Sequence, residues 1–199
     1  MADIIDRERV EEVRRRVGRP LVTVFGNSAP EEGSADYEAA RAVGRTLAEQ
    51  GYGVVNGGYG GTMAASARGA REGGGIAVGV TLAGAVWTPN RWLTETVPTP
   101  GLLERLLTLA ELGEAYVVLP GGTGTLLELA YVWEMMNKRL MWPRPILLYD
   151  GGWSAVTREI IARQPKAARW VRHVASPAEA IAGLRPSEPQ PSSVAPEPE

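Results

Sequence analysis

Short β-branched runs that end in glycine loops and lead into helix-like stretches recur along the chain, and this alternation constrains the fold more than any other feature. The run "LVTVF" is followed by "GNSAP" and a helical pattern that stops at Gly51, and "YGVVNGGYGG" leads into the helical "TMAASARGAREGG". Strands that alternate with helices of this length predict crossovers between parallel strands. We therefore expect an α/β fold, a Rossmann-like three-layer sandwich with a mostly parallel central sheet.

The expected elements cover most of the chain. Strands are predicted at 20–25, 52–56, 75–83, 114–120, 144–150 and 169–175, and helices at 34–51, 62–74, 101–113, 123–140, 153–163 and 176–184. The segment 84–100, which contains tryptophan and proline, is interpreted as a connection. The predicted organisation is an N-terminal helical extension at 1–19, a single Rossmann-like nucleotide-binding domain at 20–184, and a disordered Pro-rich tail at 185–199.

Composition narrows the classes of partner and site. With 199 residues the chain can build one sizeable core, and a formal net charge of −2 provides no broad cationic surface for nucleic acid. The absence of cysteine excludes disulfides, thiolate nucleophiles and cysteine zinc sites. The charged opening "MADIIDRERVEEVRRRVGRP" lacks an apolar signal core, and no later segment approaches the length of a membrane span. We expect a cytoplasmic protein with neither nucleic acid nor a membrane as partner.

Three glycine-containing loops follow predicted strands, at 26–28, 56–63 and 120–125. The carboxyl ends of parallel strands meet at one edge of a sheet, and glycines let backbone N–H groups approach an anion closely. These loops favour a phosphate-bearing ligand, although each could simply be a tight strand-to-helix turn. No lysine follows a glycine loop as in a Walker motif, and the G-x-G-x-x-G spacing of dinucleotide sites is absent. We therefore expect no cofactor.

Glu128 has two competing interpretations. The sequence Thr125-Leu-Leu-Glu128 matches a capping box, in which the threonine and the glutamate each bond a free backbone N–H at the start of a helix. Alternatively, a carboxylate one turn into a helix whose N-terminus holds phosphate stands roughly 5–8 Å from that phosphate, which is about the reach of a ribose.

Arg105 also has two interpretations. On a helical wheel of "GLLERLLTLAELG" it falls at the border of an apolar stripe, with Glu104, Thr108 and Glu111 facing away; the stripe is formed by Leu102, Leu103, Leu106, Leu107 and Leu109. The guanidinium could extend to solvent from the edge of the core. It could instead point into the ligand cleft and bind phosphate or pair with Glu128.

The stretch "PGGTGTLLE", of the form P-G-G-x-G-T-x-x-E, together with Arg105 fifteen positions before Pro120, resembles the Lonely Guy family of nucleoside 5'-monophosphate phosphoribohydrolases. The resemblance extends roughly from Val22 to Leu184 and includes "NGGYGGTMAASARGAREGGG" and "ILLYDGGW". Older names for such proteins include possible lysine decarboxylase. No lysine here stands in a recognisable pyridoxal-phosphate setting, so that name has no support.

The resemblance implies roles for individual residues. It makes Glu128 and Arg105 the catalytic pair, and it assigns phosphate and nucleotide binding to Gly121, Gly122, Thr123, Gly124, Thr125, Gly57, Gly58 and Ser28. It requires no metal. The lone His173 is interpreted as a structural or surface residue, because a catalytic histidine needs a positioned partner. Three positions depart from the family pattern: its Arg-Lys pair is Arg105-Leu106, a frequent arginine is Glu111, and its paired glutamates are Leu127-Glu128.

Two functions remain open from the sequence. The first is hydrolysis of the N-glycosidic bond of a nucleoside 5'-monophosphate, a cytokinin riboside monophosphate or an ordinary nucleotide, to free base and ribose 5-phosphate. The second is a non-catalytic carrier of a nucleotide or of molybdenum cofactor, because relatives with this fold include such carriers. The apolar helix "LLELAYVWEMMNKRL", together with the resemblance, also predicts a homodimer.

Overall fold

One parallel sheet of seven strands forms the centre of the computed structural model, which describes residues 5–184. The strands are β1 (Leu21–Phe25), β2 (Gly53–Asn56), β3 (Ala77–Leu82), β4 (Glu95–Thr99), β5 (Ala115–Val118), β6 (Ile146–Tyr149) and β7 (Val171–Val174). Their order is β4-β3-β2-β1-β5-β6-β7, and every neighbouring pair is parallel. The expected α/β class with a parallel sheet is confirmed. The predicted tail at 185–199 lies outside the described residues.

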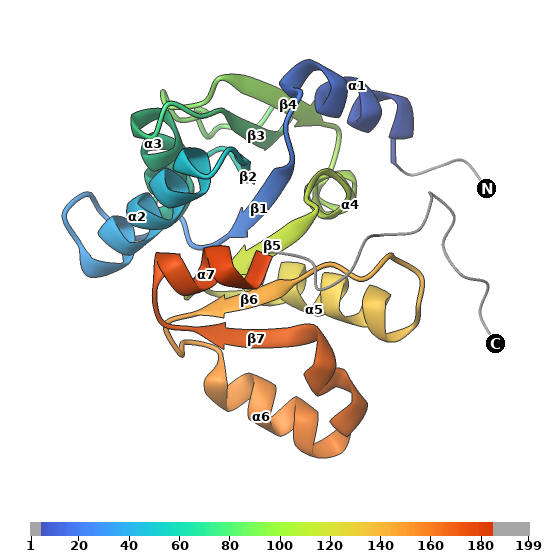
Figure 1. The fold of residues 1–199 in the computed structure, drawn as a ribbon. Helices are drawn as coiled ribbons and strands as arrows, with labels where there is room; N and C mark the ends of the chain where they lie inside the picture. The colour runs from blue at the N-terminus through green and yellow to red at the C-terminus, as the bar shows by residue number, and fades with distance from the viewer. Residues whose placement is uncertain (1–4, 185–199) are drawn as a thin grey trace.

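Helices cover both faces of the sheet (Figure 1). One face packs against α2 (Ala35–Glu49), α3 (Thr62–Glu72) and α7 (Pro177–Leu184). The other packs against α1 (Arg7–Val17), α4 (Leu102–Leu112), α5 (Thr123–Asn137), α6 (Ser154–Arg163) and the short 3₁₀ helix η1 (Pro165–Trp170). Strands β1, β2, β5 and β6 are buried along their whole length. This burial explains their near-continuous apolar sequences, since helices shield both of their faces from water.

The central pair of strands is a topological switch point. The chain winds outward from β1 through β2, β3 and β4, and then returns to place β5 on the other side of β1. Val22 pairs with Ala115 and Phe25 with Val118. The loops after β1 and β5 therefore leave the sheet side by side in opposite directions, which opens the crevice where α/β proteins bind ligands.

Strand β4 corrects the interpretation of 84–100 as a connection only. It pairs with β3 along its length at one edge of the sheet, where Pro98 lies opposite Thr81. Proline is tolerated there because an edge strand has one side without ladder hydrogen bonds. Only Val97 and Thr99 of β4 are buried. The strand therefore lacks the apolar run by which the buried strands were found.

Helix α1 lies within the predicted N-terminal helical extension, and its apolar side packs into the core. The Asp6 carboxylate accepts a hydrogen bond from the Arg9 amide at 2.9 Å and caps the start, while Gly18 ends the helix in a left-handed conformation with φ 65°. Val10, Val13 and Val17 are buried, which contributes on the order of 1.5–3 kcal/mol each. No helix among residues 5–184 is both long and apolar enough to cross a membrane.

Candidate active site

The first turn of α5 is tied to the loop after β1 across the switch-point crevice. The Thr125 hydroxyl is buried and donates a hydrogen bond to the Gly26 carbonyl at 2.8 Å. Gly26 also approaches Thr62 at the start of α3 so closely that a Cβ there would collide with the Thr62 hydroxyl. The Thr62 hydroxyl in turn accepts a hydrogen bond from the Asn27 amide at 2.9 Å. The three glycine loops therefore meet at one edge of the sheet, as predicted.

The capping-box interpretation of Thr125 and Glu128 is wrong. Helix α5 begins at Thr123 with Gly122 as the cap residue, and no side chain caps it. Thr125 is already inside the helix, and its hydroxyl is committed to Gly26. Capping therefore does not explain Glu128.

The start of α5 offers unpaired backbone donors. Its intrahelical hydrogen bonds begin with the Leu126 amide, which donates to the Gly122 carbonyl at 3.0 Å, so the amides of Thr123, Gly124 and Thr125 have no acceptor within the helix. These N–H groups, together with the positive end of the helix dipole, suit a phosphate group.

The glycines of this loop have different reasons to be glycine. A Cβ at Gly121 would collide with the Thr125 side chain, so the fold itself excludes larger residues there. A methyl group at Gly122 or Gly124 would meet no heavy atom within 4 Å, and neither residue has a positive φ. The fold does not require glycine at either position, and the absence of side chains leaves the backbone open to close approach.

Gly124→Ala separates folding from binding. Alanine favours a helix interior over glycine by about 1 kcal/mol, so we expect the variant to unfold at an equal or higher denaturant concentration than the wild type. We also expect its affinity for ribose 5-phosphate to fall by about tenfold, because the methyl group stands where the phosphate would approach. Chemical denaturation and calorimetric titration measure the two effects. Unchanged affinity would remove the loop from the binding site.

The second glycine loop is held by a buried asparagine that sequence reasoning missed. The Asn56 side chain donates to the Met63 carbonyl at 3.0 Å and to the Ser66 hydroxyl at 3.1 Å, and its oxygen accepts from the Gly58 amide at 2.8 Å. Its position as the last residue of a buried strand is the signal that could have identified it.

The remaining predicted binding residues lie beside this loop. A Cβ at Gly57 would collide with the Arg105 guanidinium, and one at Gly58, where φ is 82°, would meet the Thr81 side chain. Close packing therefore accounts for both glycines. Ser28 is exposed next to Gly60. Its hydroxyl makes no hydrogen bond to another residue of the described chain, so it remains available to a ligand.

Arg105 points into the crevice and does not extend to solvent. Its Nε donates to the Val80 carbonyl at 2.8 Å and its Nη2 donates to the Gly57 carbonyl at 3.0 Å. Its Nη1 lies 3.8 Å from Oε1 of Glu128, and its guanidinium lies 5.7 Å from the centre of the Tyr59 ring. The arginine thus connects the end of β3, the second glycine loop and α5.

Glu128 and Arg105 form a shielded ion pair. Their side chains are 13% and 12% exposed, so both charges have lost most of their hydration. Burial raises the pKa of Glu128 to about 7, and the nearby Arg105 charge only partly opposes this. Burial also lowers the pKa of Arg105, but a guanidinium stays protonated near neutral pH. A carboxyl that titrates near neutrality in a crevice suits general acid–base chemistry.

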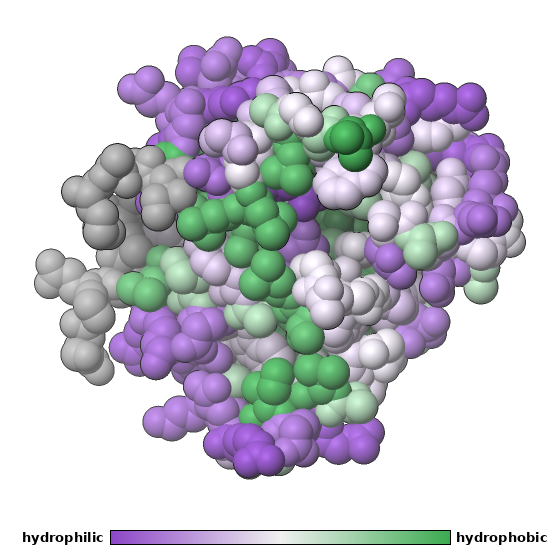
Figure 2. Space-filling view, turned by 180° about the vertical axis from the view of Figure 1, so that it is seen from behind, coloured by the Kyte–Doolittle hydropathy of each residue, from purple (hydrophilic) through white to green (hydrophobic). Residues whose placement is uncertain are grey.

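Helix α4 buries only part of the face that the helical wheel predicted: Leu106 and Leu109 are buried as expected. Leu102 and Leu103 are 58% and 50% exposed, whereas Thr108 is buried. The first turn of α4 is therefore not covered by the rest of the described chain. An apolar band also crosses the face shown in Figure 2. The large apolar side chains exposed in the described chain are Val86, Trp87, Leu102, Leu103, Leu126, Leu127 and Leu140.

An aromatic wall beside Arg105 was also missed. The Tyr59 hydroxyl accepts a hydrogen bond from the Leu82 amide at 2.8 Å, and its ring meets the Trp87 ring edge-on at 5.6 Å. Asn90 fastens the loop that carries Trp87, because its side chain donates to the carbonyls of Gly58 and Tyr59 at 3.1 and 3.0 Å.

His173 lies away from this crevice on β7, where its Nε2 is 3.2 Å from the Thr157 hydroxyl. Residues 5–184 contain no group of three or more His, Cys, Asp or Glu side chains that could hold a metal ion.

Comparison with known proteins places this geometry in a family. A profile of the SLOG cluster4 family matches residues 19–181, which is most of the chain. The chain belongs to the SLOG cluster4 family. The matched range spans all three glycine loops, Arg105 and Glu128, and the resemblance to the Lonely Guy family is confirmed.

Curated relatives of this SLOG cluster4 protein bear the name cytokinin riboside 5'-monophosphate phosphoribohydrolase. The protein from Rhodococcoides fascians is 35% identical over 52% of this chain and 54% of its own length. The protein from Mycobacterium marinum is 36% identical over 58% of this chain and 63% of its own length. The match thus spans less than two thirds of either relative.

A solved structure supports the fold. The molybdenum cofactor binding protein from Rippkaea orientalis superimposes with a TM-score of 0.68 at 20% sequence identity, over 82% of this chain and 94% of that protein.

Proposed function

We propose that the protein hydrolyses the N-glycosidic bond of a nucleoside 5'-monophosphate and releases free base and ribose 5-phosphate. The observation that carries the proposal is the shielded pair of Arg105 and Glu128 directly behind the open N-terminus of α5. The names of the curated relatives support the same reaction. The substrate base, cytokinin or ordinary, is left to experiment.

The proposed reaction uses backbone and side-chain groups of the protein itself. The free amides of Thr123, Gly124 and Thr125 would hold the 5'-phosphate and fix the ribose above Glu128. As the bond from C1' to the base nitrogen breaks, positive charge develops on the sugar, and the Glu128 carboxylate stabilises it. Water then adds to C1' and gives a proton to Glu128. Glu128 passes this proton on to the departing base. Arg105 would orient the carboxylate and attract the phosphate.

The activity should rise with pH through about 7. Glu128 acts in its ionised form, and burial raises its pKa to about 7, so kcat/KM should increase tenfold per pH unit below that value and level off above it. Substrate phosphate itself titrates near pH 6. The Glu128→Gln variant separates the ionisation of Glu128 from that of the phosphate, because its residual activity should depend on pH only through the phosphate. A profile that is flat from pH 5 to 8 in the wild type would contradict the role of Glu128.

A carrier function is the second candidate, and the glycine loops alone would serve it equally well. It is supported by the fold shared with the molybdenum cofactor binding protein from Rippkaea orientalis. Incubation with a panel of nucleoside monophosphates, followed by assays for free base and ribose 5-phosphate, decides between the two. Release from at least one nucleotide supports hydrolysis and ranks the substrates. Tight binding of a monophosphate or of molybdenum cofactor without any release would leave the carrier.

The expected homodimer stays a prediction that the exposed leucines support. Leu102 and Leu103 on α4 and Leu126 and Leu127 on α5 are exposed in the first turns of the two helices that carry Arg105 and Glu128. Covering them would also shield the crevice from water. A monomer in sedimentation at micromolar concentration would contradict this arrangement.

A further inference from the structure

A second concave surface lies at the opposite edge of the sheet from the crevice. It is a cleft of about 650 Å³ between the end of α5, the end of α6 and η1. This volume is within the range of small-molecule sites. Four cations and two amides contribute to its lining: Arg139, Arg163, Lys166, Arg169, Asn137 and Gln164. No carboxylate of the described residues lines it.

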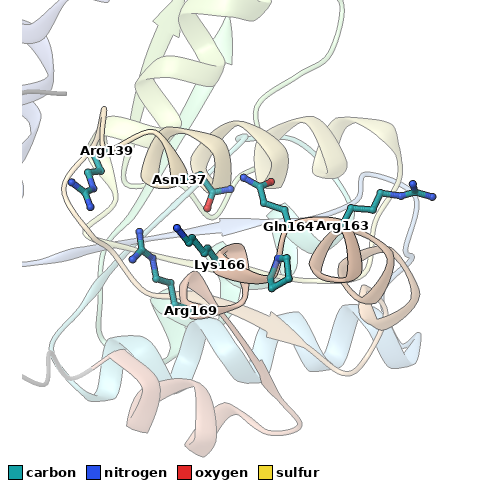
Figure 3. A pocket seen from close by; sticks show the side chains of 7 residues that line it. Asn137, Arg139, Arg163, Gln164, Lys166 and Arg169 are labelled. Carbon is teal, nitrogen blue, oxygen red and sulfur yellow. The ribbon is translucent and has the colours of Figure 1, made fainter. Parts of the chain in front are cut away.

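Two cations of this cleft form no ion pair with a carboxylate of residues 5–184, unlike many other cations of the described chain. Arg41 and Arg68, for example, both pair with Glu72. Within the described part of the chain, neither Lys166 nor Arg169 has a carboxylate in ion-pair range. Figure 3 shows the side chains of Arg139, Lys166 and Arg169 at one end of the cleft and Arg163 extending away at the other.

Stabilisation of helix ends explains only part of this arrangement. Arg163 occupies the last turn of α6 and pairs with Glu159 at 2.6 Å, as expected for a cation near a helix C-terminus. Lys166 and Arg169 follow in η1, beyond α6. Each helix C-terminus contributes only about half a negative charge, so these two cations alone leave roughly one positive charge uncompensated in the cleft.

We propose that the cleft binds a small anion whose two or more negative charges are spread over more than one group, such as a diphosphate. The ends of α5 and α6 present carbonyl groups, so the helices supply no backbone donors and side chains must hold the ligand. Arginine forks bind phosphate oxygens in pairs, lysine adds a compact charge, and the amides of Asn137 and Gln164 can donate further hydrogen bonds. Donors from separate segments favour an anion whose charges are spread over more than one group.

Calorimetric titration of the full chain with inorganic pyrophosphate tests the proposal. The double variant Lys166→Gln/Arg169→Gln removes two charges at exposed positions and should weaken binding by about tenfold or more, since each charged hydrogen bond contributes substantially. The control Arg7→Gln/Arg15→Gln removes two exposed cations from α1 and should bind like the wild type. Circular dichroism and thermal unfolding verify that both variants are folded.

Pyrophosphate could also occupy the start of α5, so the titrations are repeated in saturating ribose 5-phosphate. Pyrophosphate binding that persists in saturating ribose 5-phosphate, and is lost only in Lys166→Gln/Arg169→Gln, supports a binding site in the cleft. Equal binding by that variant and the wild type would assign the anion to another site and overturn the proposal. Absence of binding to the wild type at millimolar pyrophosphate would overturn it as well. Neither result depends on whether the protein is a hydrolase.

Discussion

Glu128→Gln should lower kcat for base release by about 10²–10⁴-fold while changing the affinity for the nucleotide only a few-fold. Glutamine keeps the size of the side chain but has no negative charge to stabilise the sugar cation and no basic oxygen to accept a proton from water. The phosphate-binding amides of α5 are untouched. Single-turnover release of free base measures the loss, and equilibrium binding of the nucleotide measures the affinity.

Glu134→Gln is the matched control, because Glu134 lies on the same helix but is exposed and pairs only weakly with Lys138 at 3.8 Å. It should retain wild-type kcat. If Glu128→Gln retained it too, the carboxylate would have no catalytic role.

The Glu128→Gln variant should be at least as stable as the wild type above pH 7. The pKa of Glu128 is about 7 in the folded protein and about 4.3 in an unfolded chain, so the folded state binds the extra proton between these values. Stability therefore falls as pH rises through this window, and the cost of burying the carboxylate is fully present above pH 7. Glutamine carries no such cost, which makes loss of activity without loss of stability the expected signature.

The sequence predicted the fold well because buried parallel strands and amphipathic helices leave strong periodic patterns. It failed at β4, which is a short edge strand with alternating burial and a proline at position 98. It also failed for the first turn of α4, where Leu102 and Leu103 are exposed. A helical wheel assigns apolar residues to one side of a helix, but it does not show which turns of the helix the rest of the fold covers.

The sequence pointed to the two charged residues of the candidate site but not to the residues that support them. Arg105 and Glu128 were found through a motif, and their contact follows from the topology that brings α4 and α5 to one edge. Thr62 and Tyr59 were not found, because each forms a hydrogen bond to a segment that is distant in sequence. Asn56 was missed although its partners, Gly58, Met63 and Ser66, are near in sequence. Thr125 was assigned to a cap that it does not form, since local spacing could not reveal the Gly26 carbonyl 99 positions earlier.

One departure from the family pattern has a structural explanation. Glu111, which replaces a frequent arginine, lies 3.5 Å from Arg144. Arg144 also donates to the carbonyls of Ala110 and Gly113 at 2.7 and 2.8 Å and so completes the end of α4. An arginine at position 111 would face this guanidinium and repel it. Glu111 instead pairs with Arg144 and so helps to hold α4, the helix that carries Arg105, in place.

Arg105→Ala should reduce both activity and stability, and Arg105→Lys should separate the two. Alanine leaves the carbonyls of Val80 and Gly57 without their donors and Glu128 without its partner, so we expect a loss of about 3–5 kcal/mol in the free energy of unfolding. Lysine restores a charge but has no planar fork to serve all three groups at once. It should recover part of the stability while kcat/KM stays lowered by about 10²-fold or more.

Denaturant unfolding and base release, measured on both variants, distinguish a positioning role from a purely structural one. Arg45→Ala is the control, because Arg45 is exposed, forms only a surface pair with Glu49, and should change stability by less than about 0.5 kcal/mol. Removal of the Arg105 charge should also raise the pKa of Glu128, because that charge is what opposes the effect of burial. The rise of kcat/KM with pH should therefore move above pH 7 in Arg105→Ala. Full activity in Arg105→Ala, with an unshifted pH profile, would leave the arginine only its structural contacts with Val80 and Gly57.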